Sequence, residues 1–307
     1  MPTGELTTYT GASVIKPDVL SLVEILTAQE NWFLTNLGKS AAISTVHQTM
    51  TDTLRTVATA AVAEEADYTN IERTVPTLVP NIVEIVAIPF RVTNTAVQVQ
   101  YYTGQNELAR QTTKALMDWG NAAEYDLVRS TLTSGTSGTA PKMNGILRGI
   151  SKSTSYTLET SGTTFSASIL KGLMKNCWDN SNGEVATDIF VGSYLSDKID
   201  DFTNKSYTVV TGTNERSIIT AVDVYETGLG KVRKHTHRYV YVSGTDANAR
   251  ILGVRPEKLG IAYLQKPYVQ TDLAKSGDYE PRAVVGKLTL EVKNKDSNFF
   301  ADGYLAA

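Results

Sequence analysis

The motif Ser168-Ile-Leu-Lys171 is the combination closest to a catalytic pair in this sequence. Serine β-lactamases and penicillin-binding proteins use a serine and a lysine in this S-x-x-K spacing, with the serine as nucleophile. Their remaining elements would have to be Ser196-Asp197-Lys198, where Lys198 replaces the required asparagine, and Lys275-Ser276-Gly277. The distance along the chain from the first motif to the second is also too short. A serine hydrolase using Ser168 and Lys171 is therefore a remote alternative, and we expect the protein not to be an enzyme.

Histidines are the second group of residues that could do chemistry. His235 and His237 would lie on one face of a strand, where two imidazoles, with His47 as a third ligand, could bind a metal ion. The surrounding side chains are cationic and would repel a divalent metal: Lys231, Arg233, Lys234 and Arg238. We predict a solvated or subunit-interface strand face here rather than a metal site.

Two further patterns resemble binding motifs without meeting their requirements. Asp197, Asp200 and Asp201 share one face of an expected helix, but no glycine loop with EF-hand spacing accompanies them. The segment Gly228-Leu-Gly230-Lys231 lacks the spacing and the Ser/Thr of a phosphate-binding loop. Its glycines predict a hairpin turn, and we expect no cofactor.

Composition excludes several classes of protein. The 307 residues are 41% hydrophobic and 20% charged, as in ordinary globular proteins. No apolar run approaches the roughly 20 residues of a membrane-spanning helix, and the first residues do not form a secretory signal. The net charge of −3 argues against a dedicated nucleic-acid binder. The single cysteine, Cys177, excludes an internal disulfide and suits a reducing compartment.

The longest helical pattern in the sequence predicts a helix at 106–132. Apolar residues recur there at spacings of three and four, and the stripe includes Leu108, Leu116, Trp119 and Leu127. At about 1.5 Å per residue the helix would be roughly 40 Å long. Gly120 in its middle indicates a slight bend or the close approach of another segment. We expect the apolar side to pack on a strand near the C-terminus, at 285–292.

The segments before this helix have few local partners for their apolar residues. Residues 1–39 contain the cluster Trp32-Phe33-Leu34, which fits either a frayed terminus with one helix or an arm that docks elsewhere. Residues 40–104 contain the β-branched run 82–86, flanked by prolines that favour edge strands. We expect a long β-hairpin excursion without a core of its own.

The rest of the chain alternates helices and strands. Helices are predicted at 165–180, with Trp178 on the apolar side, and at 194–202, with a buried strand at 188–192 between them. Strands follow at 217–264 and at 283–292. This order of elements predicts the α+β class.

Several of these motifs, in this order, resemble one group of major head proteins of tailed bacteriophages. The resemblance covers about residues 10–305. It rests on the following segments: Arg91-Val-Thr-Asn-Thr-Ala96, the helix at 106–130, Glu226-Thr-Gly-Leu-Gly-Lys-Val232, Leu273-Ala-Lys-Ser-Gly-Asp278 and the strand at 287–292. Leu229 stands where the family usually has an aromatic residue.

The resemblance implies the Hong-Kong-97-like capsid fold. Its expected parts are an N-terminal arm (1–39), an extended loop lying over a neighbouring subunit (40–104), a peripheral domain with the spine helix (105–164), an axial domain (165–270) and closing strands of the peripheral domain (271–307).

The resemblance also implies a function and partners. The chain would be a major capsid protein that assembles into hexameric and pentameric capsomers of an icosahedral head, encloses double-stranded DNA and is assembled in the host bacterial cytoplasm. Portal protein, and scaffolding or decoration proteins, would be further partners, and no membrane would be involved. A tail-tube or other virion structural protein is the alternative, although it would not need so long a helix. Interface candidates are the apolar residues that their own segments cannot bury: Trp32, Phe33, Leu34, Ile82, Ile85 and Val86.

Overall fold

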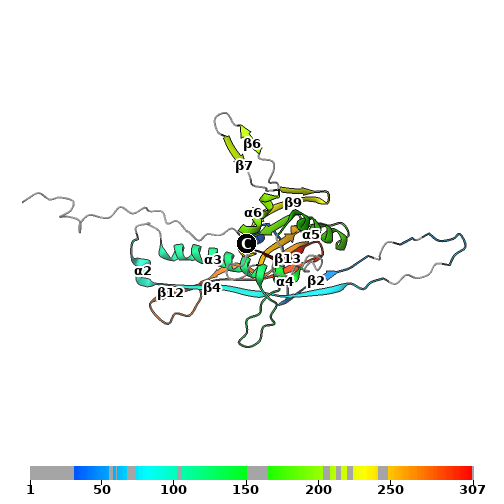
Figure 1. Ribbon diagram of the computed structural model, residues 1–307. Coiled ribbons are helices and arrows are strands. Elements are labelled where there is room, and N and C mark those ends of the chain that lie inside the picture. The colour runs from blue at the N-terminus through cyan, green and yellow to red at the C-terminus, as the bar shows by residue number, and fades with distance from the viewer. Residues whose placement is uncertain are drawn as a thin grey trace, which may run out of the picture.

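The structure is a computed structural model that describes residues 31–54, 58–59, 61–67, 73–101, 106–150, 165–202, 208–211, 216–219, 224–240 and 248–305. The molecule is elongated, with a helix lying along a long sheet and a second sheet beside them (Figure 1). The expected α+β class is confirmed. No helix in the described residues is long and apolar enough to cross a bilayer.

The first sheet carries the long helix and has four strands. Their order is β1 (Gly38–Ala41), β11 (Leu259–Gln270), β12 (Tyr279–Val292) and β4 (Glu84–Thr93). β12 pairs antiparallel with both β11 and β4, whereas β1 pairs parallel with β11. β4 is an edge strand, which is where a proline such as Pro89 is tolerated in a sheet. The short helix α2 (Asn94–Gln98) follows β4.

The predicted spine is one continuous helix, α3 (Glu107–Arg129). Asn106 caps it by accepting a hydrogen bond from the backbone N–H of Leu108 at 2.9 Å. Four of the residues facing the sheet are buried: Ala115, Trp119, Ala123 and Leu127. The indole Nε1 of Trp119 donates to the carbonyl of Val86 on β4 at 3.0 Å, and the ring lies against Gly286 on β12, which confirms the predicted packing on the strand at 285–292. Leu116 was expected in this stripe and lies on the same side of the helix as Trp119, but it is 42% exposed.

A second sheet has the order β13-β10-β5-β9-β8 and its own hydrophobic core. Its strands are β5 (Asp188–Val191), β8 (Val224–Thr227), β9 (Gly230–Thr236), β10 (Asn248–Val254) and β13 (Phe299–Leu305). The helices α5 (Ala167–Asn180) and α6 (Ser193–Asp201) lie at the predicted positions. Trp178 was expected on the buried side of α5 but is largely exposed.

Two ribbons project from this body, β2–β3 and β6–β7 (Figure 1). Their strands are β2 (Val46–Thr51), β3 (Thr77–Ile82), β6 (Thr208–Thr211) and β7 (Arg216–Ile219). The remaining short helices are α1 (Trp32–Asn36), α4 (Ile146–Gly149) and the 3₁₀ turn η2 (Pro256–Lys258).

The two sheets do not follow the expected boundaries. Residues 259–270 were expected in the axial domain, but β11 pairs with β1 and β12 in the first sheet. Conversely, β13 near the C-terminus pairs with β10 in the second sheet. The reason is that the chain passes from the second sheet to the first between β10 and β11, and returns to the second sheet at the turn 293–298 between β12 and β13.

The expected arm and loop are also partly integral to the subunit. α1 packs on α3, and β1 extends the first sheet, so the residues after 31 belong to the body. In the expected loop, Val83, Val86 and Val92 are buried. The prediction that residues 40–104 lack a core was therefore wrong for β4, whose core is supplied by α3 and β12, elements far along the chain.

Candidate subunit-interface surfaces

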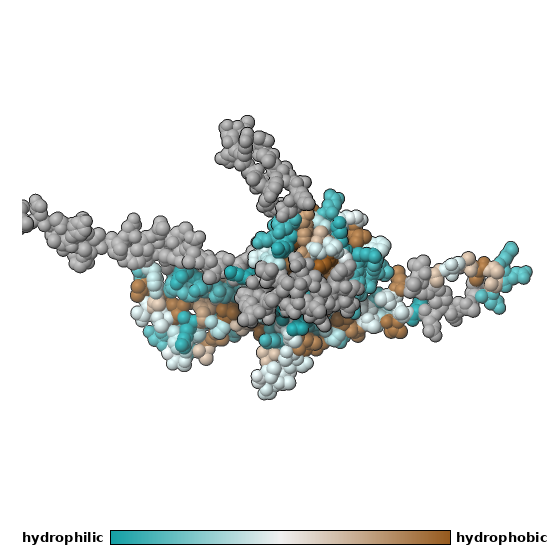
Figure 2. Space-filling model, in the orientation of Figure 1, coloured by the Kyte–Doolittle hydropathy of each residue, from teal (hydrophilic) through white to brown (hydrophobic). Residues whose placement is uncertain are grey.

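The β2–β3 ribbon has two chemically different faces. Its register pairs Val46 with Ile82 and Met50 with Leu78, and directly paired residues of antiparallel strands lie on the same face. Val46 is 44%, Leu78 55% and Met50 68% exposed. The ribbon thus presents to solvent a face, called here the apolar face, that carries these four residues together with Pro80 and one polar residue, Gln48. Hydrophobic patches are visible on the projecting ribbon at the right of Figure 2.

The opposite, polar face of the ribbon is bound to the subunit's own body. His47 Nε2 lies 2.7 Å from Glu291 Oε1. The amide of Asn81 donates to the carbonyl of Leu290 at 2.8 Å and accepts from the backbone N–H of Asn144, also at 2.8 Å. Because buried polar groups require partners, these bonds fix which face of the ribbon turns inward. The apolar face of the ribbon therefore points away from the body.

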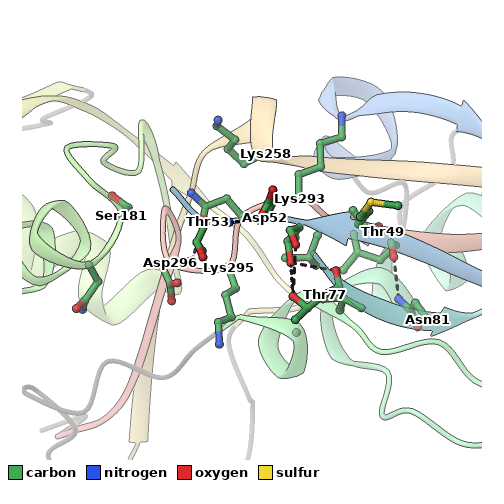
Figure 3. A pocket seen from close by; sticks show the side chains of 18 of the residues that line it. Thr49, Asp52, Thr53, Thr77, Asn81, Ser181, Lys258, Lys293, Lys295 and Asp296 are labelled. Carbon is green, nitrogen blue, oxygen red and sulfur yellow. Dashed lines mark hydrogen bonds between the residues drawn. The ribbon is translucent and has the colours of Figure 1, made fainter. Parts of the chain in front are cut away.

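A groove of about 800 Å³ lies between the ribbon and the turn 293–298 (Figure 3). Its lining is mostly hydroxyl and amide groups, including Thr49, Thr51, Thr53, Thr77, Asn180 and Asn182. Three lysines, Lys258, Lys293 and Lys295, and two carboxylates, Asp52 and Asp296, complete the charged lining. Lys258 is neutralised by Glu184 at 2.7 Å, so the groove has no strong excess of either charge. It offers hydrogen bonds rather than an anion site.

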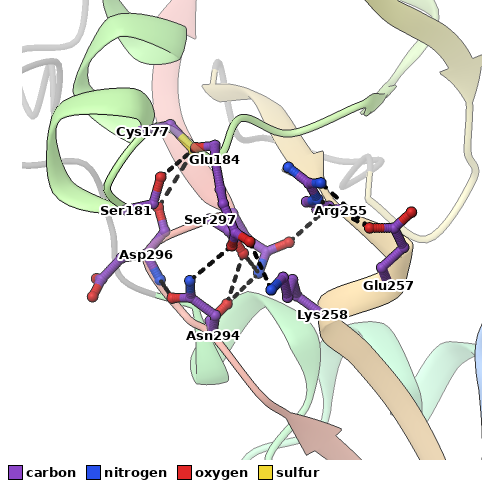
Figure 4. A network of polar contacts seen from close by, with 10 residues as sticks. Cys177, Ser181, Glu184, Arg255, Glu257, Lys258, Asn294, Asp296 and Ser297 are labelled. Atoms are coloured by element: carbon purple, nitrogen blue, oxygen red, sulfur yellow. Dashed lines mark hydrogen bonds and ion pairs between the residues drawn. The ribbon is translucent and has the colours of Figure 1, made fainter. Parts of the chain in front are cut away.

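A polar network behind this groove joins the two sheets (Figure 4). Glu184, between α5 and β5, accepts hydrogen bonds from Lys258 at 2.7 Å and from Asn294 at 3.1 Å. Burial pushes the pKa of Glu184 up, but these bonds outweigh it and the pKa is lowered overall. Cys177 lies in the same network, and burial raises the pKa of its thiol to about 11. A thiol in this state is inert, so the network is structural.

Glu124 of α3 forms a second buried network. Its side chain is fully buried and accepts hydrogen bonds from the backbone N–H groups of Phe33 at 2.7 Å and Leu34 at 2.9 Å. His237 Nε2 lies 3.1 Å from the same carboxylate. The ring's Nδ1 accepts from the backbone N–H of Tyr239 at 3.3 Å, so the proton must be on Nε2 and is donated to Glu124. One carboxylate therefore binds three donors from two other segments.

The histidines do not converge on a site. His235 pairs with Asp188 at 2.9 Å, His47 with Glu291 and His237 with Glu124. The described residues contain no group of three metal-binding side chains. The expected solvated or interface face was wrong for His237, which is buried because a carboxylate of α3 lies within hydrogen-bonding distance of it.

The remaining chemistry candidates are dispersed. Ser168 is exposed and its hydroxyl pairs with that of Ser166 at 2.8 Å, while Lys171 is exposed on the same helix. Among the aspartates of α6, Asp200 pairs with Lys234 at 2.6 Å. Gly230 has a φ of 149° in the turn between β8 and β9, so the predicted hairpin is confirmed.

The six interface candidates differ in how far the isolated subunit buries them. Phe33 and Val86 are buried in its own core, a correction to the expectation that a neighbour would cover them. Trp32 and Leu34 are partly buried against the same core, again by α3 and the sheets. Ile82 is half-buried and Ile85 is 53% exposed. Only the last two, both near the ribbon's base, keep apolar surface without a clear internal cover.

The alternation along β2 indicates a strand with two different faces. His47, Thr49 and Thr51 alternate with Val46, Gln48 and Met50. The alternation does not tell which face turns inward. That depends on Glu291 and Leu290, which lie more than 200 residues away.

Comparisons with known proteins agree on one kind of molecule. The family model of the SU10 major capsid protein matches residues 2–304. No curated protein sequence matches.

Solved structures are similar over nearly the whole chain. The capsid of the native GTA particle has a TM-score of 0.70 at 9% identity, covering 99% of this chain and 100% of that one. A structure from Gordonia phage Cozz has a TM-score of 0.64 at 13% identity, covering 100% of this chain and 97% of that one. The holo-SrpI encapsulin complex from Synechococcus elongatus PCC 7942 has 0.64 at 11%, covering 98% and 96%. The expected Hong-Kong-97-like fold is confirmed.

Proposed function

We propose, because this chain belongs to the SU10 major capsid protein family, that it forms the shell of a phage head from hexameric and pentameric capsomers. Its family and fold are those of structural capsid proteins that assemble in many copies. We further propose that the shell is icosahedral and that it encloses double-stranded DNA without binding it in a sequence-specific way. A net charge of −3 suits a shell that does not grip its polyanionic contents.

The observation that carries the proposal is the outward apolar face of the β2–β3 ribbon. A soluble monomer rarely exposes contiguous apolar surface on a projecting element, because such surface promotes association. Here Asn81 and His47 hold the polar face inward, and in this position Met50 and Leu78 remain exposed. A neighbouring subunit that covers this face would remove these apolar side chains from water. At about 25 cal/mol per Å² of apolar area, a few hundred Å² is worth several kcal/mol before ordering costs.

The proposed parts of the subunit follow from this fold. Residues 1–30 are the arm, the β2–β3 ribbon with its tip is the loop that lies over a neighbour, and the first and second sheets are the cores of the peripheral and axial domains. Ile82 and Ile85 are proposed as interface residues together with the apolar ribbon face. Portal, scaffolding and decoration proteins are the proposed further partners, in a virion assembled in the host cytoplasm.

Electron microscopy of the purified full-length protein tests the proposal. Closed shells, or rings of five and six subunits, are expected on raising the protein concentration. Stacked rings or tubes would favour a tail-tube protein instead. A particle-free monomer at every concentration, with and without co-expressed scaffolding candidates, would contradict the shell.

A further inference from the structure

The buried carboxylate of Glu124 is placed to control more than the stability of α3. We infer that Glu124 is a positioning residue for assembly: by binding α1 it fixes where the N-terminal arm leaves the subunit, and by binding His237 it ties that exit point to the second sheet. This inference rests on the proposed function, because it assigns a role to the proposed arm at residues 1–30.

The first step is the chemistry at Glu124. Three N–H groups converge on its two oxygens, from Phe33, Leu34 and His237. An amide in place of the carboxylate would offer one acceptor oxygen, and its NH₂ group would face a donor. Hydrogen bonds to a charged acceptor are stronger than those between neutral groups, and leaving a buried donor unpaired is destabilising. α1 has only five residues and cannot form a stable helix alone, so its docking depends on such external bonds.

The second step is the contact that brings α1 to this carboxylate. Gly120 lies one helical turn before Glu124, and a Cβ at Gly120 would come within 2.7 Å of Asn31 Nδ2. A glycine in the middle of a helix is destabilising relative to alanine. Here the missing side chain allows the side-chain amide of Asn31 to approach α3 closely. Glycine and carboxylate together define a docking position for the start of α1.

The third step connects this docking position to the rest of the body. After α1, the chain continues within two residues into β1, which pairs parallel with β11 from Gly38 to Ala41. On its other side α1 contacts the second sheet, where the ring of Phe33 lies 4.6 Å from that of Phe190, centre to centre. The position of Asn31, where the described chain begins, is therefore set relative to both sheets.

The test compares full-length variants in the unassembled state and in assembly. Glu124→Gln removes the shared acceptor. Gly120→Leu displaces α1 sterically and leaves the carboxylate intact; leucine is used because rotation of the Asn31 side chain could relieve a clash with alanine. Glu84→Gln is the matched control, since Glu84 is a buried carboxylate that accepts from Ser130 and Met143 and not from the arm.

We expect amide hydrogen exchange at Phe33, Leu34 and β1 to become at least about tenfold faster in Glu124→Gln and Gly120→Leu, with exchange in β12 unchanged. The yield of closed shells should fall by a similar factor, and Glu84→Gln should behave as wild type in both measurements. Unchanged exchange at α1 overturns the inference. So does faster exchange with a normal shell yield, because the contact would then be structural only.

Gly120→Leu keeps the test decisive if Glu124→Gln fails to fold, since leucine is a good helix former and the spine is expected to persist. Failure of the proposed function is separable: it would appear as an absence of shells from the wild-type protein, whatever the exchange rates of the variants.

Discussion

The indole ring of Trp119 on α3 lies directly against Gly286 on β12. A Cβ at Gly286 would come within 2.4 Å of the ring, so only glycine allows the helix to lie this close to the sheet. The same indole donates its N–H to the carbonyl of Val86 on β4. One side chain thus sets both the distance between helix and sheet and their relative position along the strands.

Trp119→Ala is expected to lower the free energy of unfolding by about 3–5 kcal/mol, because it removes a buried aromatic ring and leaves a cavity over Gly286. Denaturant unfolding of the unassembled subunit measures this. Gly286→Ala should also destabilise, here by overpacking, by about 1–3 kcal/mol. Wild-type stability in Trp119→Ala would contradict the packing described. Leu116→Ala, at an exposed position of the same helix, is the control and should change stability little.

Met50→Asp should abolish shells while leaving the subunit folded. Met50 is 68% exposed on the apolar ribbon face, so a carboxylate there meets water in the free subunit but would be buried without a partner under a neighbour. Circular dichroism checks that the subunit is folded, and electron microscopy checks whether shells form. The control is Met50→Leu, which preserves the apolar surface and should assemble. Normal shells from Met50→Asp would exclude this face from the interface.

Glu84 and Asp126 should each contribute more to the stability of the isolated subunit as the pH falls from 7 toward 4.5. Burial, followed by the charge of Asp126, raises the pKa of Glu84 above its ordinary value of 4.5, and burial raises the pKa of Asp126 above 3.8. A carboxyl whose pKa is raised by folding binds its proton more readily in the folded state. Its contribution to stability is therefore complete below the unfolded-state pKa and is lost as the pH rises through the folded-state pKa.

Glu84→Gln isolates this effect, because glutamine keeps an acceptor for Ser130 and Met143 but does not titrate. The variant should be as stable as wild type or more stable at pH 7, with a flatter dependence of the unfolding free energy on pH. Urea unfolding between pH 4.5 and 7 gives both slopes. A wild-type slope of the opposite sign that disappears in Glu84→Gln would show that ionised Glu84 is the favoured form.

Two N-terminal truncations should differ sharply. Deleting residues 1–30 removes the proposed arm and should leave a folded subunit that fails to form stable closed shells. Deleting residues 1–39 also removes the buried ring of Phe33 and part of β1, so it should destabilise the subunit by several kcal/mol. Thermal unfolding followed by circular dichroism, beside negative-stain images, distinguishes the two. Intact shells from the shorter truncation would refute the role of the arm.

Local sequence patterns determined the elements whose signals lie within a few turns of chain. The spacing of Trp119, Ala123 and Leu127 and the cap at Asn106 define α3, because helix formation depends on neighbours three and four residues away. The alternation along β2 likewise shows a strand with two different faces, and the glycines before β9 show a turn.

Only the tertiary structure decided which of these faces is inside. From the sequence, Phe33 and Val86 had no local partners that could bury them, because the residues that do so, on α3 and β12, are distant in sequence. His237 looked solvated because Glu124, its partner, is 113 residues away. The exchange of β11 and β13 between the sheets, and the outward apolar face of the ribbon, have the same cause. Burial is a property of contacts between segments, and a single sequence records the residues of such contacts without recording their pairing.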